Sequence, residues 1–229
     1  VASLDNLTMQ GLGGTIGLAG DFSTVDEQKP KINFSYDLKG IDIKALSDNF
    51  LTIEKLAPIA KHATGKISTS FSMNSSLTPN LDPIYSTLNG KGDLFTKMVS
   101  ISDYEPLVKI GNALKMDNLS NQTINDLKTF FSFKDGKLSL TPFDVKLGGI
   151  LTNISGSTTF EQFIDYALKM NIPKDKIPAS MLKTVEDQIK KVNSLVPNLN
   201  LDVLPAMIPV KLKVLGTVSN PKVTTDFKE

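Results

Sequence analysis

The feature that most constrains the fold of this chain is a period of two in its apolar residues. Over residues 31–39 the sequence KINFSYDLK places an apolar residue at every second position and a polar residue between. Residues 66–73, 165–172 and 210–214 show the same alternation. Because successive side chains of a strand point to opposite faces, each segment is predicted to be a strand with one apolar face. Several such strands are typical of an antiparallel sheet with one solvated face.

Turn sequences separate these strands. Asp135-Gly136 lies between two short alternating runs and is the strongest hairpin signal in the chain. Gly148-Gly149 joins the next two runs, so residues 126–160 are predicted to form a meander of three strands. Further strands are expected near residues 4–10, 14–22, 90–101 and 222–227.

Helix signals interrupt the strands. Asp82-Pro83 is typical of a helix start, and Ser102 to Glu105 fits a capping box. Helices are therefore expected at residues 43–63 with a break at Pro58, at 82–88, after 102, and at 178–195. No shift in composition divides the chain, so we expect one domain over residues 1–229. Its expected class is α+β: a long, mostly antiparallel, twisted and curved β-sheet with one apolar face covered by several helices.

The inventory of reactive residues is small. The chain has no cysteine, a single histidine and a formal net charge of +1, and all 25 of its basic residues are lysine. Thiolate chemistry, disulfides and cysteine-based metal sites are excluded, and the missing arginine weakens a nucleic-acid reading. His62 has no second histidine or acidic cluster beside it and is interpreted as an exposed residue at a helix end. We expect no enzyme, no cofactor, no metal and no nucleic-acid partner.

The candidate functional residues are the large apolar residues of the alternating strands. If helices cover the apolar face incompletely, acyl chains are expected to lie against these residues; the alternative is that they form an ordinary core beneath the helices. The candidates for lipid contact are Phe34, Tyr36, Phe71, Met73, Phe131, Phe133, Tyr166 and Met170.

A series of short segments resembles a known family. In chain order they are LNGKGDL (88–94), LVKIGNAL (107–114), FKDGKL (133–138), PFDVKLGG (142–149), ISGST (154–158) and VLGTVSNPKV (214–223). Together they resemble the C-terminal region of the AsmA family over roughly residues 65–227. The lysine-rich, arginine-free composition is similar to that of a Bacteroidetes-type member.

The resemblance implies a biological setting. AsmA-like proteins are held in the inner membrane of Gram-negative bacteria by an N-terminal helix, with the remainder in the periplasm, and are linked to outer-membrane biogenesis. Larger relatives are thought to carry phospholipid along a β-sheet groove. The chain starts at Val1 and has no apolar run long enough to span a bilayer, so we expect a fragment of a longer, membrane-anchored protein.

Two functions are expected from this setting. The first is a non-enzymatic periplasmic module in envelope assembly that holds or passes phospholipid along the apolar sheet face. The alternative is a structural or protein-interaction domain that binds an envelope protein through a sheet edge, without lipid.

Overall fold

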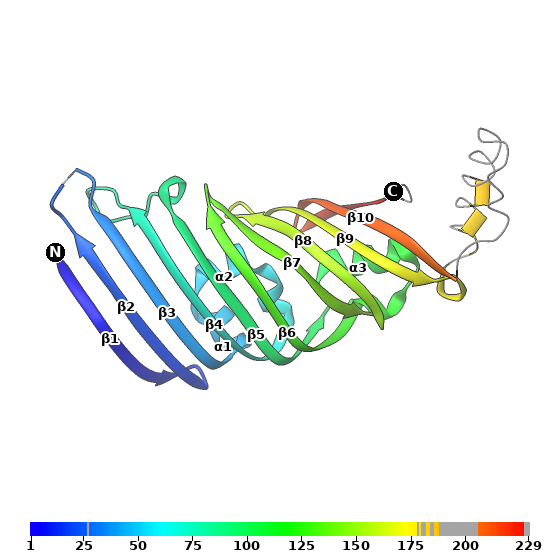
Figure 1. The fold of residues 1–229 in the computed structure, drawn as a ribbon, viewed down its shortest axis with the longest axis horizontal. Coiled ribbons are helices and arrows are strands. Elements are labelled where there is room, and N and C mark those ends of the chain that lie inside the picture. The colour runs from blue at the N-terminus through cyan, green and yellow to red at the C-terminus, as the bar shows by residue number, and fades with distance from the viewer. Residues whose placement is uncertain (27, 178, 180–181, 184–185, 188–205, 227–229) are drawn as a thin grey trace.

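The computed structural model describes residues 1–26, 28–177, 179, 182–183, 186–187 and 206–226. These residues form one sheet of eleven strands in which every strand pairs antiparallel with its neighbours in the chain, in the order β1 to β11 (Figure 1). The strands are β1 Ala2–Gly11, β2 Gly14–Ser23, β3 Lys31–Asp42, β4 Ala63–Ser76, β5 Asn89–Ser102, β6 Asn121–Lys134, β7 Lys137–Leu147, β8 Ile150–Thr159, β9 Phe163–Pro173, β10 Met207–Thr217 and β11 Asn220–Asp226.

The helices lie in two of the connections. Between β3 and β4 are α1 (Ile43–Asn49), α2 (Leu51–Leu56) and the 3₁₀ turn η1 (Pro58–His62). Between β5 and β6 are α3 (Glu105–Leu114) and η3 (Asp117–Ser120). Two further 3₁₀ turns, η2 (Tyr85–Thr87) and η4 (Lys174–Lys176), follow β4 and β9. Both helical connections leave the sheet at the same end of the strands, so the helices gather at one end of one face (Figure 1).

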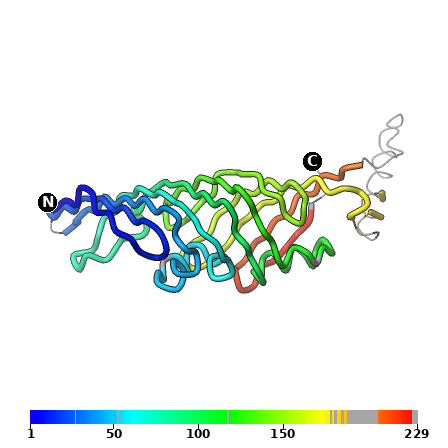
Figure 2. Tube along the Cα trace, turned by 90° about the horizontal axis from the view of Figure 1, so that it is seen from below, coloured from blue at the N-terminus to red at the C-terminus, as the bar shows by residue number. Residues whose placement is uncertain are grey.

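The sheet curls around its helices. Viewed from below, the helices and the C-terminal strands β10 (orange) and β11 (red) lie on the same side (Figure 2), and α3 packs against β11. Register shifts between Leu38 and Ile41, and between Leu140 and Phe143, mark bulges that increase the local twist and bend. We call the face on which the helices pack the inner face and the opposite one the outer face.

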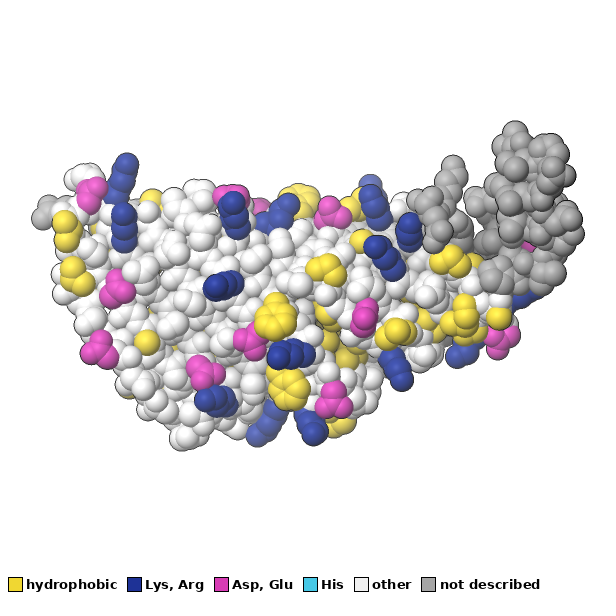
Figure 3. Space-filling model, viewed as in Figure 1, with side chains coloured by type: hydrophobic (Ala, Val, Ile, Leu, Met, Phe, Trp, Pro, Cys, Tyr) yellow, Lys and Arg dark blue, Asp and Glu magenta, His cyan; other side chains and the backbone are white. Residues whose placement is uncertain are grey.

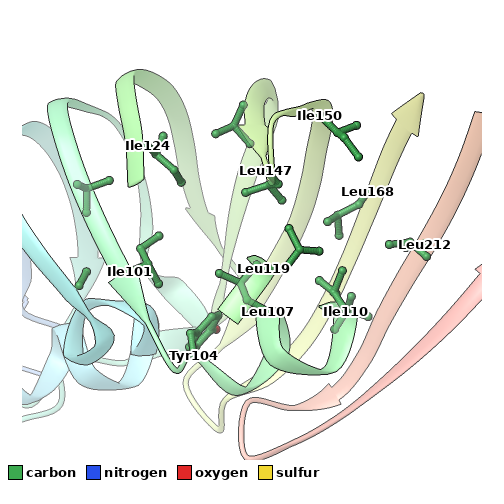
Figure 4. Packing of buried hydrophobic residues seen from close by; sticks show 14 of the residues in the cluster. Ile101, Tyr104, Leu107, Ile110, Leu119, Ile124, Leu147, Ile150, Leu168 and Leu212 are labelled. Carbon is green, nitrogen blue, oxygen red and sulfur yellow. The ribbon is translucent and has the colours of Figure 1, made fainter. Parts of the chain in front are cut away.

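The core lies between α3, η3 and the strands of the C-terminal half. Leu107 and Ile110 of α3 and Leu119 of η3 point toward inner-face residues of β6 to β10, including Leu147, Leu168 and Leu212 (Figure 4). A second group on α1 packs on β3 and β4, where Ile41 is fully buried. Strand β1 contributes no residue to this core cluster.

The expected α+β class is wrong: the described residues form a mostly β fold, and the helices α1, α2 and α3 are short. The helices have seven, six and ten residues and cover one end of the inner face rather than the whole of it. The meander over β6, β7 and β8 is confirmed, and Asp135 and Gly136 form its first turn with φ of 52° and 73°. Residues 43–63 were expected to be helical in two pieces with a break at Pro58; the break at Pro58 is present, between α2 and η1, but a further break at Phe50 separates α1 from α2.

Two helix starts differ from the prediction. Residues 82–88 contain no α-helix, because the backbone N–H of Ser76 bonds to the Thr87 hydroxyl (2.9 Å) and Leu77 pairs with Pro83, which holds this segment as a loop. At 102–105 a helix follows, but its N-cap is Tyr104 and no side chain caps it, so the capping box is wrong. Most of the helix expected at 178–195 lies outside the described residues. No described helix has the length and apolar character needed to cross a membrane.

Candidate binding surface

Five of the eight candidate residues lie together on the inner face, beyond the end of the sheet that the helices cover. Phe34 of β3 faces Met73 of β4, and Tyr36 of β3 faces Phe71. Phe131 of β6 lies two strands further along, since Gly92 of β5 faces both Phe71 and Phe131. The register therefore gathers side chains that are far apart in the sequence into one surface.

Aromatic rings form a continuous row across β3 to β6. The ring centroids of Tyr36 and Phe71 are 5.6 Å apart, and those of Phe71 and Phe131 are 5.7 Å apart with nearly parallel planes. The row crosses β5 because this strand has glycine at two successive inner positions. A Cβ at Gly90 would lie 2.5 Å from the ring of Phe71, and one at Gly92 would lie 2.6 Å from the ring of Phe131. The two rings thus lie over a β5 backbone that carries no side chain there.

This aromatic row remains half-exposed. On the helix side of the row, Leu38 and Ile67 are buried against the core, whereas Phe34, Phe71 and Met73 are only half-buried. Leu138 and Leu140 of β7 extend the same surface, opposite Phe133 and Phe131, and are also half-buried. We call this surface the apolar strip; it consists of Phe34, Tyr36, Phe71, Met73, Phe131, Leu138 and Leu140.

The other three candidates also lie on the inner face but are not part of the strip: Phe133 adjoins it opposite Leu138, and Tyr166 and Met170 lie on β9. Phe133 is 2% exposed and packs on Phe160 with ring centroids 5.2 Å apart. Met170 is buried in the core. Tyr166 lies over Gly156, and its hydroxyl is 2.7 Å from the hydroxyl of Thr158. Phe133 and Met170 therefore belong to the packed interior, and Tyr166 borders it.

Comparison of the chain with known proteins does not assign a function to this surface. No protein-family description, curated protein or solved structure matches the chain.

The sequence interpretation missed Leu138 and Leu140 because only aromatic and methionine residues were considered. It also missed the part played by Gly90 and Gly92. The signal was present in Asn-Gly-Lys-Gly (89–92), where two glycines recur with the period of a strand. Such a pattern indicates a strand over which neighbouring side chains can lie.

The outer face has a different character. Polar side chains and backbone cover most of it, with lysines, acidic residues and several exposed apolar side chains scattered over it (Figure 3). A shallow depression of about 560 Å³ on this face is lined by serines of β3, β4 and β6 together with Lys91, Asp93 and Phe130. The Ser70 hydroxyl donates to the Asp93 carboxylate. Among the described residues, no histidine or lysine side chain hydrogen-bonds to the Ser70 hydroxyl.

No metal or histidine chemistry is assembled in the described part of the chain. His62 is exposed, its Nδ1 lies 3.3 Å from the carbonyl oxygen of Ser102, and its ring packs beside Tyr104. Among the described residues no three His, Asp or Glu side chains are grouped as metal ligands would be.

Three tyrosines that pack against the core, Tyr36, Tyr104 and Tyr166, are expected to make stability sensitive to high pH. Burial raises the pKa of Tyr104, of Tyr166 and of Tyr36; in Tyr36 a hydrogen bond with Thr69 opposes the effect. When the pKa of a tyrosine is higher in the folded protein than in the unfolded chain, the free energy of unfolding does not change below the pKa of the unfolded chain. It falls as the pH rises above that pKa, because the unfolded chain then loses the tyrosine proton more readily. We therefore expect the free energy of unfolding to fall above about pH 10, by up to ~1.4 kcal/mol per pH unit for each tyrosine.

Urea unfolding at about pH 9 and about pH 11 measures this loss. The double variant Tyr104→Phe/Tyr166→Phe is expected to lose less stability over this interval than the parent protein, whereas Tyr85→Phe, which alters an exposed loop residue, is not. Equal losses in all three proteins would show that buried tyrosines do not cause the effect.

Proposed function

We propose that the apolar strip holds the acyl chains of phospholipid, and that the protein is a non-enzymatic periplasmic module in envelope assembly. The observation that carries the proposal is the half-exposed aromatic row on a face that the helices cover only at one end. The resemblance to the AsmA family supports the setting in the periplasm and the link to outer-membrane biogenesis.

The chemistry of the strip suits an acyl chain. All seven of its residues are apolar or aromatic, and no charged side chain lies among them because the alternation places Lys31, Asp37 and Lys91 on the outer face. Removing apolar surface from water contributes roughly 25 cal/mol per Å², or about 0.8 kcal/mol for each buried CH₂ group. An acyl chain on the strip is stabilised in this way because both its own surface and the rings beneath it are removed from water.

The length of the strip also suits an acyl chain. It runs across the strands from β3 to β7, which are four strand spacings apart. At ~4.8 Å for each spacing this is roughly 19 Å, a length comparable with an extended acyl chain. A chain lying in this direction crosses Gly90 and Gly92, where the rings of Phe71 and Phe131 form a smooth surface.

Native mass spectrometry of the protein purified without detergent tests the proposal. We expect masses that correspond to bound phospholipid. The Phe34→Asp variant is expected to bind at least tenfold more weakly, because a carboxylate would have to be buried against hydrocarbon. The matched control is Phe163→Asp, since Phe163 lies on the outer face and is 57% exposed.

Circular dichroism must show that both variants remain folded. An apo mass for the parent protein, with no uptake from vesicles of phosphatidylethanolamine and phosphatidylglycerol, would contradict lipid binding. Equal loss of binding in the two variants would contradict the assignment to the apolar strip.

A further inference from the structure

Lysines gather on the outer face of the later strands. Lys169 of β9 and Lys211 of β10 lie directly opposite each other in the register, and Lys213 follows two residues further along β10. Lys146 occupies an outer position of β7, two strands away from Lys169. All four side chains are exposed. We call these four residues the lysine patch.

Pairing within the sheet does not account for the lysine patch. Like charges directly opposite each other on neighbouring strands are unfavourable. Lysine protects the edges of sheets, but β9 and β10 each have a strand on both sides. Among the side chains that the structure describes, no carboxylate forms an ion pair with a patch lysine. The nearby Asp144 accepts a hydrogen bond from Asn153 (2.8 Å) instead. The positive charges of the patch are therefore available to a partner outside the chain.

Apolar side chains border the lysines on the same face. Leu151 of β8 faces Lys146 and is 60% exposed. Leu215 lies at the next outer position after Lys213, faces Asp165 and is 39% exposed. Figure 3 shows lysine and apolar side chains next to one another toward the right-hand end of this face. An anionic bilayer has a negatively charged surface with hydrocarbon directly beneath it, so it matches a surface that carries both lysine and leucine.

We propose that the lysine patch docks the protein on the surface of an anionic lipid bilayer. Side chains of a strand stand roughly perpendicular to the sheet, so the four ammonium groups form an array and do not converge on one point. Such an array suits many lipid head groups lying in one plane better than it suits a single phosphate ion. Leu151 and Leu215 then reach the boundary between head groups and hydrocarbon.

Nucleic acid is the other extended polyanion, and the surface suits it less well. The chain has no arginine to bind phosphates bidentately. No aromatic residue is paired with a patch lysine in the described strands or lies next to one on the outer face of the same strand, so bases have no ring there on which to stack.

Co-sedimentation with lipid vesicles tests the docking. We expect binding to vesicles of phosphatidylethanolamine and phosphatidylglycerol at about 0.1 M salt, and binding about tenfold weaker or more at about 0.5 M salt, because salt screens the attraction. Vesicles of phosphatidylcholine alone should bind little protein, since they carry no net charge.

The variant Lys169→Gln/Lys211→Gln is expected to bind the anionic vesicles about tenfold more weakly or less, because each lysine near the surface contributes to the attraction. The matched control is Lys31→Gln/Lys91→Gln, which removes the same charge from exposed positions of β3 and β5 and should leave binding nearly unchanged. Circular dichroism must show that both variants remain folded.

The lysine patch and the apolar strip lie on opposite faces, so the docking stands whether or not the strip holds acyl chains. Phe34→Asp separates the two proposals, since it is expected to lose phospholipid from the strip but to keep binding to the vesicles. A protein that does not bind anionic vesicles, or that binds phosphatidylcholine equally well, overturns the docking. So does equal weakening by the two double variants, or a protein that ignores vesicles but binds a single-stranded oligonucleotide through Lys169 and Lys211.

Discussion

Replacing Gly92 with alanine is expected to lower the free energy of unfolding by about 2–3 kcal/mol, the upper range for overpacking by one methyl group. The added Cβ would lie 2.2 Å from the backbone carbonyl oxygen of Ser70 and 2.6 Å from the ring of Phe131. The carbonyl belongs to the neighbouring strand and cannot move without disturbing the β4–β5 pairing. The ring has little freedom to move because it stacks on Phe71.

Urea unfolding measures this loss, and Gly17→Ala is the control. Gly17 also lies in a strand, but a Cβ there would be 3.4 Å from the nearest atom, the carbonyl oxygen of Asp37, which is an ordinary contact. Alanine is expected to be tolerated at Gly17, where the change should stay within about 0.5 kcal/mol. If both variants are equally stable, the close approach of Phe131 to the β5 backbone is not a constraint on the fold.

Replacing Leu119 with alanine is expected to cost about 3–4 kcal/mol, which is typical of a large cavity in a packed core. Leu119 is fully buried at the junction of α3, η3 and the sheet (Figure 4). The turn between β7 and β8 closes over it, since a Cβ at Gly148 would lie 3.0 Å from the Leu119 Cδ2 atom. The surrounding elements are short connections joined to the sheet at both ends, so they have little freedom to collapse into the cavity.

The control for this variant is Leu51→Ala, because Leu51 is 65% exposed in α2. Its effect is expected to lie within about 0.5 kcal/mol. Both variants should show the same dependence of unfolding free energy on urea concentration as the parent protein. A loss at Leu119 of less than about 1 kcal/mol would mean that α3 and η3 are loosely packed on the sheet.

The strands were predictable because their signal is local. Period-two alternation over residues 31–39 and the turn at Asp135-Gly136 specify strand and hairpin without distant contacts. The fold class was not predictable in the same way. Whether the helix signals at Asp82 and Ser102 produce a helix depends on the hydrogen-bond partners that the nearby polar groups have in the folded protein. The Thr87 hydroxyl accepts from Ser76 across the loop, which a helical reading of residues 82–88 does not anticipate.

The candidate surface was predictable only in part. Alternation assigns Phe34, Phe71 and Phe131 to the apolar face, but their distance from one another depends on register across three pairings. The burial of Phe133 could not be deduced from its strand, because it comes from Phe160 in the turn between β8 and β9. Two residues of the same strand, Phe131 and Phe133, thus differ in exposure for reasons that lie outside it.

The order of the strands has a consequence for how the molecule loses its structure. Each of the eleven described strands pairs only with its neighbours in the chain, so among them no crossover ties the first strands to the last. Contacts between sequence neighbours favour rapid formation of such a sheet, but they also allow it to open stepwise. Strand β1 lies outside the core cluster, whereas Leu212 and Val214 of β10 are almost fully buried. We therefore expect opening to begin at β1 and to cost progressively more free energy as it advances toward β10.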